Sequence, residues 1–223
     1  MPTVLITGAN RGLGLEFVRQ YAAEGWRVIA CCRKPKDAGA LSKVKGDVVV
    51  EALDVTNDAQ ITKLAQRLKS DAIDLLINNA GIFGPRSGSD TAAWLEVFQV
   101  NTIAPFRMAE AFAAQVARSK LKKIANITSA MGSIGSNQSS DSPVYRSSKA
   151  ALNMVMKGLS NELKSKGITI AVLHPGWVKT DMGGAGAPIA IPDSIGSLRK
   201  VIAKLTPADN GKFFNYDGKP LPW

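Results

Sequence analysis

The feature that most constrains the fold is an apolar run that leads directly into a glycine-rich turn near the start of the chain. The run Thr3 to Thr7 has the character of a buried β-strand. The turn that follows reads Gly8-Ala9-Asn10-Arg11-Gly12-Leu13-Gly14. Amides at a helix N-terminus lack internal partners, so an anion binds there where the turn has no bulky side chains. We therefore expect a strand-to-helix turn that cradles a phosphate.

The spacing of this turn leaves an alternative open. Its order is Gly-x-x-x-Gly-x-Gly, which is neither the Gly-x-Gly-x-x-Gly dinucleotide pattern nor a P-loop, because no Gly-Lys-Ser/Thr follows. The glycines Gly8, Gly12 and Gly14 would also suit a tight turn that needs them only for packing. Its position directly after the first predicted strand favours phosphate contact.

Apolar strand-like runs recur along the whole chain, and segments of helical periodicity separate most of them. The runs are Thr3 to Thr7, Arg27 to Cys32, Val48 to Leu53, Ile73 to Ile77, Lys123 to Thr128, Ile168 to His174 and Phe213 to Tyr216. Such alternation is typical of a parallel sheet covered on both faces. We predict an α/β, Rossmann-type doubly wound fold, with a mostly parallel seven-stranded sheet flanked by helices. Ligands of such folds bind outside the carboxyl ends of the strands.

The length of 223 residues fits one domain of this class. We predict a single domain over residues 1–223, with a cofactor half of about 1–120 and a catalytic and substrate half of about 121–223. No repeat, low-complexity tract or proline-rich linker divides it. The polar segment 133–143 and the Gly-, Ala- and Pro-rich segment 182–192 are candidate flaps beside a site.

The formal net charge of +10 raises the question of nucleic-acid binding. The basic residues are spread over several predicted elements, without a stripe or interleaved aromatics, so we expect solvated helix faces and no nucleic-acid partner. They include Lys63, Arg67, Lys69, Arg118, Lys120, Lys122, Lys123, Lys157, Lys164 and Lys166. With no signal peptide, no apolar span and only the adjacent Cys31 and Cys32, we also expect a cytoplasmic protein without membrane contact.

The end of the second predicted strand bears on cofactor choice. An acidic residue there would bind the adenosine ribose of NAD, but this chain has Cys32-Arg33-Lys34. Arg33 and Arg11 would instead hold a 2′-phosphate, and at roughly 1.5–3 kcal/mol per charged hydrogen bond they would give roughly a hundredfold preference. We predict that NADP(H) is preferred and that NAD(H) remains possible. Arg33 as a simple loop cation is the alternative.

A second constellation lies downstream, where Tyr145 and Lys149 are four positions apart and so share a helical face. A tyrosine with a pKa near 10 is a poor base at neutral pH, and a nearby ammonium is expected to lower that pKa. Tyr145 would then exchange a proton with a carbonyl oxygen that Ser129 orients. The Tyr-x-x-x-Lys spacing occurs often by chance, so a catalytic role for Tyr145 and Lys149 is inferred only because Ser129 and the glycine turn are also present.

Other chemistries lack the residues they need. His174, the only histidine, ends an apolar run before Pro175, and a core or turn role is expected. No Gly-x-Ser-x-Gly elbow is present for a hydrolase. One histidine and two adjacent cysteines do not form a tetrahedral zinc set, so no metal is expected.

Taken together, the glycine turn, Ser129 and the Tyr145–Lys149 pair make the chain resemble the short-chain dehydrogenases/reductases, and further matching stretches extend this resemblance from end to end. Closer features, including Arg11 to Gly14, Cys32-Arg33, Tyr145 to Asn153 and the closing Asp217 to Trp223, look most like the C-factor-like and sniffer-like carbonyl reductases. The stretches that match the family are Thr7 to Gly14, Asp54-Val55, Asn78-Asn79-Ala80-Gly81, Asn101, Ser129, Tyr145 to Lys149, and Pro175 to Thr180.

The resemblance implies roles for many of these residues. Tyr145, Lys149 and Ser129 would be catalytic, and Asn101 would hold a water that links Lys149 to solvent. Lys149 would also hold the nicotinamide ribose. The cofactor would contact Gly8, Asn10, Arg11, Gly12, Leu13, Gly14, Arg33, Asp54, Val55, Asn79, Ala80, Gly81, Tyr145, Lys149, Pro175, Gly176, Val178 and Thr180.

Several of these roles have ordinary alternatives. In the resemblance, Asp54 and Val55 face the adenine and Thr180 binds the nicotinamide carboxamide. Asp54 would equally suit a helix cap, and Asn78-Asn79 a turn. The interval from Ser129 to Tyr145 is a few residues longer than is common in the family, which bears on substrate access.

The predicted function is NADPH-dependent reduction of small or medium apolar aldehydes and ketones, with Tyr145 as general acid/base. Phe83, Trp177 and Met182 are expected to line the substrate pocket, or else to be core or loop cover. The alternatives are a C-factor-like, NADP-sensing signalling protein with little turnover and an NAD-dependent alcohol dehydrogenase. The resemblance also suggests a homodimer or homotetramer that packs through the helices holding Asn101 and Tyr145.

Overall fold

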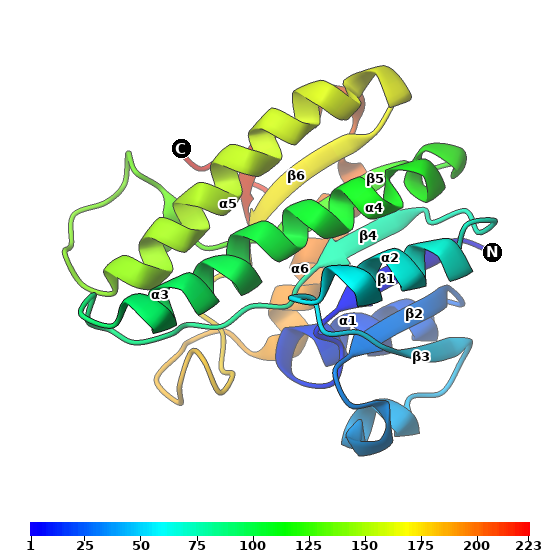
Figure 1. Ribbon diagram of the computed structural model, residues 1–223, viewed down its shortest axis with the longest axis horizontal. Helices are drawn as coiled ribbons and strands as arrows, with labels where there is room; N and C mark the ends of the chain where they lie inside the picture. The colour runs from blue at the N-terminus through cyan, green and yellow to red at the C-terminus, as the bar shows by residue number, and fades with distance from the viewer.

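The computed structural model describes residues 1–223, and its seven strands form one sheet. The strands are β1 (Thr3–Thr7), β2 (Arg27–Cys32), β3 (Val48–Ala52), β4 (Leu75–Asn78), β5 (Lys123–Ile127), β6 (Thr169–His174) and β7 (Lys212–Asn215). They lie in the order β3-β2-β1-β4-β5-β6-β7, and each neighbouring pair is parallel. The predicted seven-stranded Rossmann-type sheet is confirmed, and its strands are all parallel (Figure 1).

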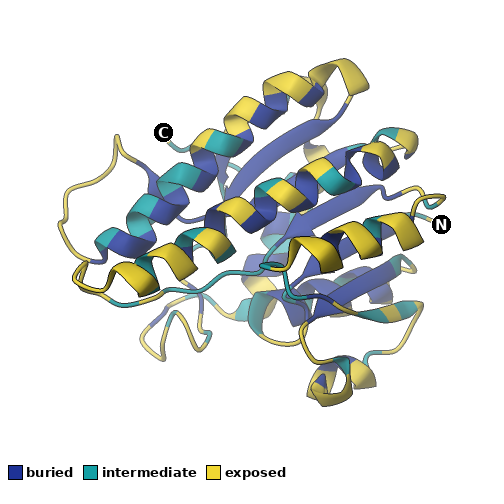
Figure 2. Ribbon diagram, viewed as in Figure 1, coloured by how far each residue is buried: buried dark blue, intermediate teal, exposed yellow.

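Helices cover both faces of this sheet (Figure 1). They are α1 (Gly12–Ala23), α2 (Asp58–Arg67), α3 (Thr91–Phe98), α4 (Ala104–Arg118), α5 (Pro143–Glu162) and α6 (Ile191–Lys204). Along β1, Val4 and Ile6 pack in the core with α1 and α6, whereas Leu5 packs in the core with α2, α4 and α5. Figure 2 shows the result, a buried sheet behind helices whose outward faces are exposed. Both faces of each central strand are therefore apolar, as the sequence indicated.

The order of the strands fixes where a ligand binds. From β1, the strands β2 and β3 follow toward one edge of the sheet, and β4 then lies on the other side of β1. The loops after β1 and β4 therefore leave the sheet in opposite directions, and ligands of this fold class bind in the crevice between such loops. The glycine turn follows β1, and the segment Asn79-Ala80-Gly81 follows β4.

β1 and β2 have the predicted ends, and each of the other strands differs from its predicted run by one or two residues at one or both ends, for local reasons. β4 begins at Leu75 because the Ile73 amide donates to Gln115 and the Asp74 carboxylate accepts the Thr3 amide at 2.9 Å. β7 ends at Asn215 because the chain turns back there, and the Gly218 amide donates to the Asn215 carbonyl.

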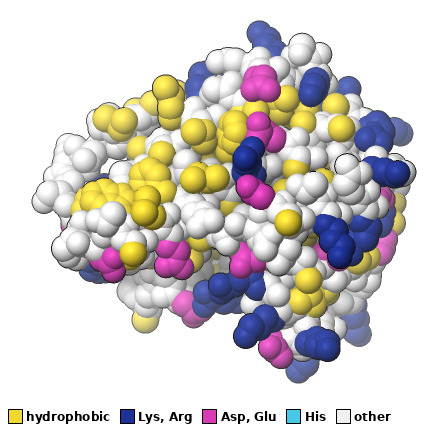
Figure 3. All heavy atoms as spheres, in the orientation of Figure 1, with side chains coloured by type: hydrophobic (Ala, Val, Ile, Leu, Met, Phe, Trp, Pro, Cys, Tyr) yellow, Lys and Arg dark blue, Asp and Glu magenta, His cyan; other side chains and the backbone are white.

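Charged side chains of both signs are interspersed over the face in Figure 3, without a stripe of one sign. Lys123 departs from the expected solvated state. It is buried in β5, and its Nζ donates to the carbonyls of Ile202 and Ala203, at 2.8 and 2.9 Å, at the end of α6. A cation suits the negative end of a helix dipole, so Lys123 caps α6.

None of the helices combines the length and the apolar character that crossing a membrane requires.

Candidate active site

The three glycines of the first turn, Gly8, Gly12 and Gly14, have different structural roles. A Cβ at Gly14 would lie 2.2 Å from the Gly8 carbonyl oxygen, and one at Gly8 would lie 2.9 Å from the Cα of Ala80. Gly8 and Gly14 are thus required for packing of α1 against β1 and β4. Gly12 has a left-handed φ of +54°, and the nearest atom to its missing Cβ is Thr180 Cγ2 at 3.9 Å. The turn is open at Gly12, where a phosphate can approach the backbone.

Asn79 and Thr7 join the glycine turn to the loop after β4. The Thr7 hydroxyl accepts hydrogen bonds from the amides of Asn79 and Ala80 at 3.0 and 3.1 Å. The Asn79 side chain donates to the carbonyls of Thr7 and Gly8 at 2.9 and 3.2 Å. Asn79 therefore holds the loop after β4 against the glycine turn, in addition to its predicted role in contacting the cofactor. The sequence interpretation missed this role for Thr7, whose only signal is a hydroxyl at the last position of a buried strand.

Arg33 and Asp54 lie near each other beyond the carboxyl ends of β2 and β3. Arg33 is exposed. Hydrogen bonds from the amide and hydroxyl of Thr56, with a smaller effect of the Arg33 charge, lower the pKa of Asp54. The cap of α2 is Asn57, which accepts from the Gln60 amide, so the alternative of Asp54 as that helix cap is wrong. Val55 lies close to Thr7 and Ala80 in the interior, between the glycine turn and the start of α4.

Tyr145 and Lys149 lie one turn apart on α5, which begins at Pro143. Both are buried, with 7% and 4% of the residue exposed. Lys149 Nζ donates to the Ile127 carbonyl at 3.0 Å and lies 5.7 Å from the centre of the Tyr145 ring. A Cβ at Gly81 would lie 3.6 Å from the same Nζ, so the loop after β4 reaches this pair.

The protonation of this pair differs from the expected one. Burial raises the pKa of Tyr145 to about 12, although hydrogen bonding with Ser129 opposes this. Burial also lowers the pKa of Lys149 to about 8. The expected lowering of the tyrosine pKa by Lys149 is therefore not found, because loss of water disfavours the charged form of both groups. At neutral pH Tyr145 holds its proton and is ready to act as an acid.

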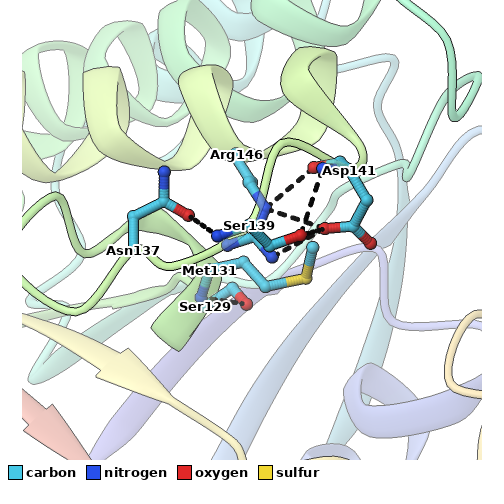
Figure 4. Close-up of polar contacts among 6 residues, drawn as sticks. All are labelled: Ser129, Met131, Asn137, Ser139, Asp141 and Arg146. Atoms are coloured by element: carbon cyan, nitrogen blue, oxygen red, sulfur yellow. Dashed lines mark hydrogen bonds and ion pairs between the residues drawn. The ribbon is translucent and has the colours of Figure 1, made fainter.

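Ser129 lies just beyond β5 and caps the short helical turn Ala130–Gly132. Its hydroxyl oxygen accepts from the Met131 amide at 3.1 Å, as Figure 4 shows. A hydroxyl that accepts this bond still has its own proton to donate. Ser129 is buried and close enough to Tyr145 to affect its pKa, so the two hydroxyls converge.

Asn101 lies in a π-helical segment, Gln99–Ile103, between α3 and α4. Its side chain accepts from the Ile82 amide at 2.9 Å and donates to the Ile82 carbonyl at 2.8 Å and to Ser148 Oγ at 3.0 Å. Ser148 in turn donates to the Tyr145 carbonyl at 2.8 Å. Asn101 therefore connects the loop after β4 to α5. Ser148 was not singled out in the sequence, and its place inside the Tyr-x-x-x-Lys spacing is the only signal for it.

Of the three predicted substrate residues, Phe83 lies against Tyr145. Their rings stack with centroids 4.5 Å apart and an angle of 23°. Trp177 and Met182 are 59% and 48% exposed in the loop 175–190 between β6 and α6, called the flap from here on, where Trp177 Nε1 donates to the Gly183 carbonyl at 2.8 Å. Phe83 is thus beside Tyr145, and the other two lie at the surface of the flap.

The flap is a compact loop next to the glycine turn. Thr180 Oγ1 accepts from the Gly183 amide at 3.0 Å, and the Val178 bridge to Ile189 closes the base of the loop. The flap also reaches the glycine turn through Arg11, whose guanidinium lies 3.0 Å from the Asp181 carboxylate.

The remaining predicted cofactor residues are Leu13, half-buried against the core; Asn10, exposed; Pro175, whose carbonyl accepts from Ser194; and Gly176, packed against Ile189 and Tyr216.

The polar segment 133–143 is held at both ends. At its start, Ser133 Oγ donates to the Pro222 carbonyl at 2.7 Å and the Gly135 amide donates to the Trp223 backbone oxygen at 2.6 Å. At its other end, Arg146 clamps Asp141 (Figure 4). The tail 222–223 thus supports the segment that links Ser129 to Tyr145.

Comparison with known proteins agrees with this geometry. The family model for the short chain dehydrogenases matches residues 2–187. The chain is 40% identical to the C-signal of Myxococcus xanthus over 154 residues, which cover 68% of this chain and 93% of that protein. Among solved structures, carbonyl reductase Sniffer of D. melanogaster superposes with a TM-score of 0.92, at 34% identity, over 100% of both chains.

A second structure, the NADPH-bound carbonyl reductase from chicken fatty liver, gives a TM-score of 0.90 at 35% identity. It is matched over 100% of this chain and 99% of that chain. The chain therefore belongs to the short-chain dehydrogenase/reductase family. Its relatives in the comparison include the C-signal and the sniffer-like carbonyl reductases that the sequence resembled.

Proposed function

We propose that this oxidoreductase is an NADPH-dependent carbonyl reductase that reduces small or medium apolar aldehydes and ketones. The observation that carries the proposal is the convergence of three buried groups, Tyr145, Ser129 and Lys149, with Lys149 Nζ 5.7 Å from the centre of the Tyr145 ring. A donor that is protonated at neutral pH suits reduction, in which the carbonyl oxygen must gain a proton. The likeness to carbonyl reductases, one of them bound to NADPH, supports the same direction.

The crevice between the glycine turn and the flap fits a dinucleotide. Gly12 is open where a pyrophosphate would meet the start of α1, and Thr180 faces it from the flap. Arg33 is exposed at the adenosine end and Arg11 lies at the turn, so both would hold a 2′-phosphate. Asp54, Val55 and the segment Asn79-Ala80-Gly81 would line the adenosine and ribose side. NADPH, when bound, supplies the hydride.

The chain's own residues would then manage the proton. Tyr145 donates its phenolic proton to the carbonyl oxygen of the substrate, and Ser129 donates a second hydrogen bond that polarises this oxygen. Lys149 holds the nicotinamide ribose and lies beside Tyr145, and a water that Asn101 helps to position would link Lys149 to solvent, from which the proton is replaced. Phe83 provides an apolar wall beside Tyr145.

Tyr145→Phe tests this function. We expect NADPH oxidation with a panel of aldehydes and ketones to fall by about 10²–10⁴-fold, because the general acid is lost, while NADPH still binds. Absorbance of NADPH measures the rate, and its fluorescence measures binding. Tyr21→Phe is the matched control, since Tyr21 is also a buried tyrosine but lies on α1. Equal losses in both variants would contradict the proposal.

A second function deserves a test because of the identity to the C-signal. In that case the chain would sense NADP and signal with little turnover. NADPH binding without oxidation, across aldehydes, ketones and quinones, would favour this function over the reductase. NADH oxidised in preference to NADPH would instead favour an NAD-dependent dehydrogenase.

We also propose a cytoplasmic homodimer or homotetramer. Two apolar side chains support it, Ile103 of the π-helical segment and Met154 of α5, which are 52% and 72% exposed. Such side chains suit an interface between copies. Sedimentation of wild type and Met154→Glu measures the assembly, and a monomeric wild type would contradict it.

A further inference from the structure

The connection between β4 and α3 carries a cation to the neighbourhood of Tyr145. Phe83 of this connection stacks on Tyr145, as described above. Three residues later, the guanidinium carbon of Arg86 lies 5.7 Å from the centre of the Phe83 ring. A positive charge is therefore placed one aromatic ring beyond the proposed proton donor.

The other charges nearby balance one another. Arg146 Nη2 donates to Asp141 Oδ1 at 2.8 Å, and Ser139 Oγ donates to the same oxygen at 2.6 Å, as Figure 4 shows. Hydrogen bonds from Ser139 and Arg146, with a smaller effect of the Arg86 charge, lower the pKa of Asp141. Asp141 is thus ionised at neutral pH and matched by Arg146. Arg86 has no ion pair or side-chain hydrogen bond of its own.

The exposure of Arg86 suits anion recognition, because its guanidinium contacts Phe83 only near the outer limit of a cation–π interaction. A guanidinium that lies over an aromatic ring keeps its in-plane N–H donors free, and these match the two oxygens of a carboxylate.

We infer that Arg86 is a specificity-determining residue that favours carbonyl substrates carrying a carboxylate, separated from the reacting carbonyl by a flat apolar spacer. The inference rests on the proposed reductase function and sharpens it. The carbonyl meets Tyr145 and Ser129, the spacer lies along Phe83, and the carboxylate pairs with Arg86. The apolar part that was predicted for the substrate is then the spacer between its two polar ends, and the end away from the reacting carbonyl is anionic.

The experiment compares para-carboxybenzaldehyde with its methyl ester, which has nearly the same shape without the charge. We expect wild type to prefer the acid, and Arg86→Ala to lower the acid-to-ester ratio of kcat/KM about tenfold, given the value of one charged hydrogen bond. The loss should appear in KM, with kcat for the ester unchanged. Arg86→Lys should restore part of the ratio because it keeps the charge.

Lys166→Ala is the matched control, since it removes one exposed positive charge beyond the far end of α5. An acid-to-ester ratio that is the same in wild type and Arg86→Ala would overturn the inference. Binding of para-(hydroxymethyl)benzoate and its methyl ester, measured by protein fluorescence, makes the same comparison without turnover. Failure of wild type to reduce either aldehyde would therefore overturn the reductase function, while the binding ratio still decides the role of Arg86.

Discussion

Arg11 and Asp181 form an ion pair of 3.0 Å although they are 170 positions apart in the chain. The pair spans the space between the glycine turn and the flap, beside the open Gly12 and the facing Thr180. Both side chains are largely exposed, so the pair contributes at most about 1 kcal/mol to stability. Its consequence lies in binding, because the guanidinium that pairs with Asp181 is also one of the two that would meet a 2′-phosphate.

Asp181→Asn should therefore tighten NADPH binding. Without the carboxylate, Arg11 no longer has a competing partner, and we expect the Kd for NADPH to fall by about two- to fivefold, in line with a weak exposed pair. The Kd for NADH should not change, because it lacks the 2′-phosphate. Fluorescence titration measures both. Asp47→Asn, at another exposed carboxylate, is the control, and equal tightening toward NADH and NADPH would contradict the competition.

Two alanine substitutions in the glycine turn should separate packing from ligand contact. Gly14→Ala places a Cβ 2.2 Å from a carbonyl oxygen, and we expect the free energy of unfolding to fall by about 1–3 kcal/mol or more. Gly12→Ala meets no atom closer than 3.9 Å, so it adds only the strain of a left-handed φ, about 1–2 kcal/mol.

Urea denaturation without cofactor measures the stability of both variants, and NADPH titration measures binding. Gly12→Ala should weaken NADPH binding more than its stability loss accounts for, since a side chain would stand where the phosphate approaches. A Gly12→Ala variant that binds NADPH as wild type does would show that this glycine serves the turn alone.

Stability should rise with pH because of Lys149. Burial lowers its pKa to about 8 from 10.5, so between these values the unfolded chain binds more protons than the folded one. The free energy of unfolding therefore gains from this group as pH rises from about 8 to about 10.5. Tyr145, whose pKa is raised, acts in the opposite sense above about pH 10. Urea denaturation of wild type and Lys149→Met at about pH 7 and about pH 9.5 isolates the effect of Lys149. A difference between the two proteins that does not change with pH would contradict it.

His174 should make the fold sensitive to acid. Its ring is largely buried, Nδ1 has no hydrogen-bond partner, and burial lowers its pKa to about 4 from 6.5. The unfolded chain takes up this proton first, so the stability contribution is lost as pH falls from about 6.5 to about 4. We expect the Tm of wild type to fall more than that of His174→Gln between about pH 7 and about pH 5. Thermal unfolding followed by circular dichroism provides the values, and parallel losses would refute the role of His174.

Much of the fold follows from local patterns. Each buried strand is a short apolar run, and its position could be predicted because strands such as β1 and β2 are apolar on both faces. The candidate site could also be placed, since Gly12, Ser129 and Thr180 all follow carboxyl ends of strands. The sequence did not predict the exact ends of strands such as β4, which depend on contacts such as that of Asp74 with Thr3.

Other features depend on distant contacts and had no local signal. Lys123 looked like one more surface cation, but it caps a helix that ends about 80 positions later. The pKa of Tyr145 was predicted to fall because the spacing places Lys149 nearby, whereas the depth of burial, which spacing does not report, raises it. The pairing of Arg11 with Asp181 likewise needed the folded flap.

The bonds from Ser133 and Gly135 to the tail 222–223 bear on how the protein is best produced. A purification tag fused after Trp223 would begin at the backbone that supports the segment between Ser129 and Tyr145. Met1 is 77% exposed and lies on the opposite side of the molecule from the other end of the chain (Figure 1). Fusion before Met1 therefore keeps added sequence away from the site, whereas residues added after Trp223 would lie next to the segment between Ser129 and Tyr145.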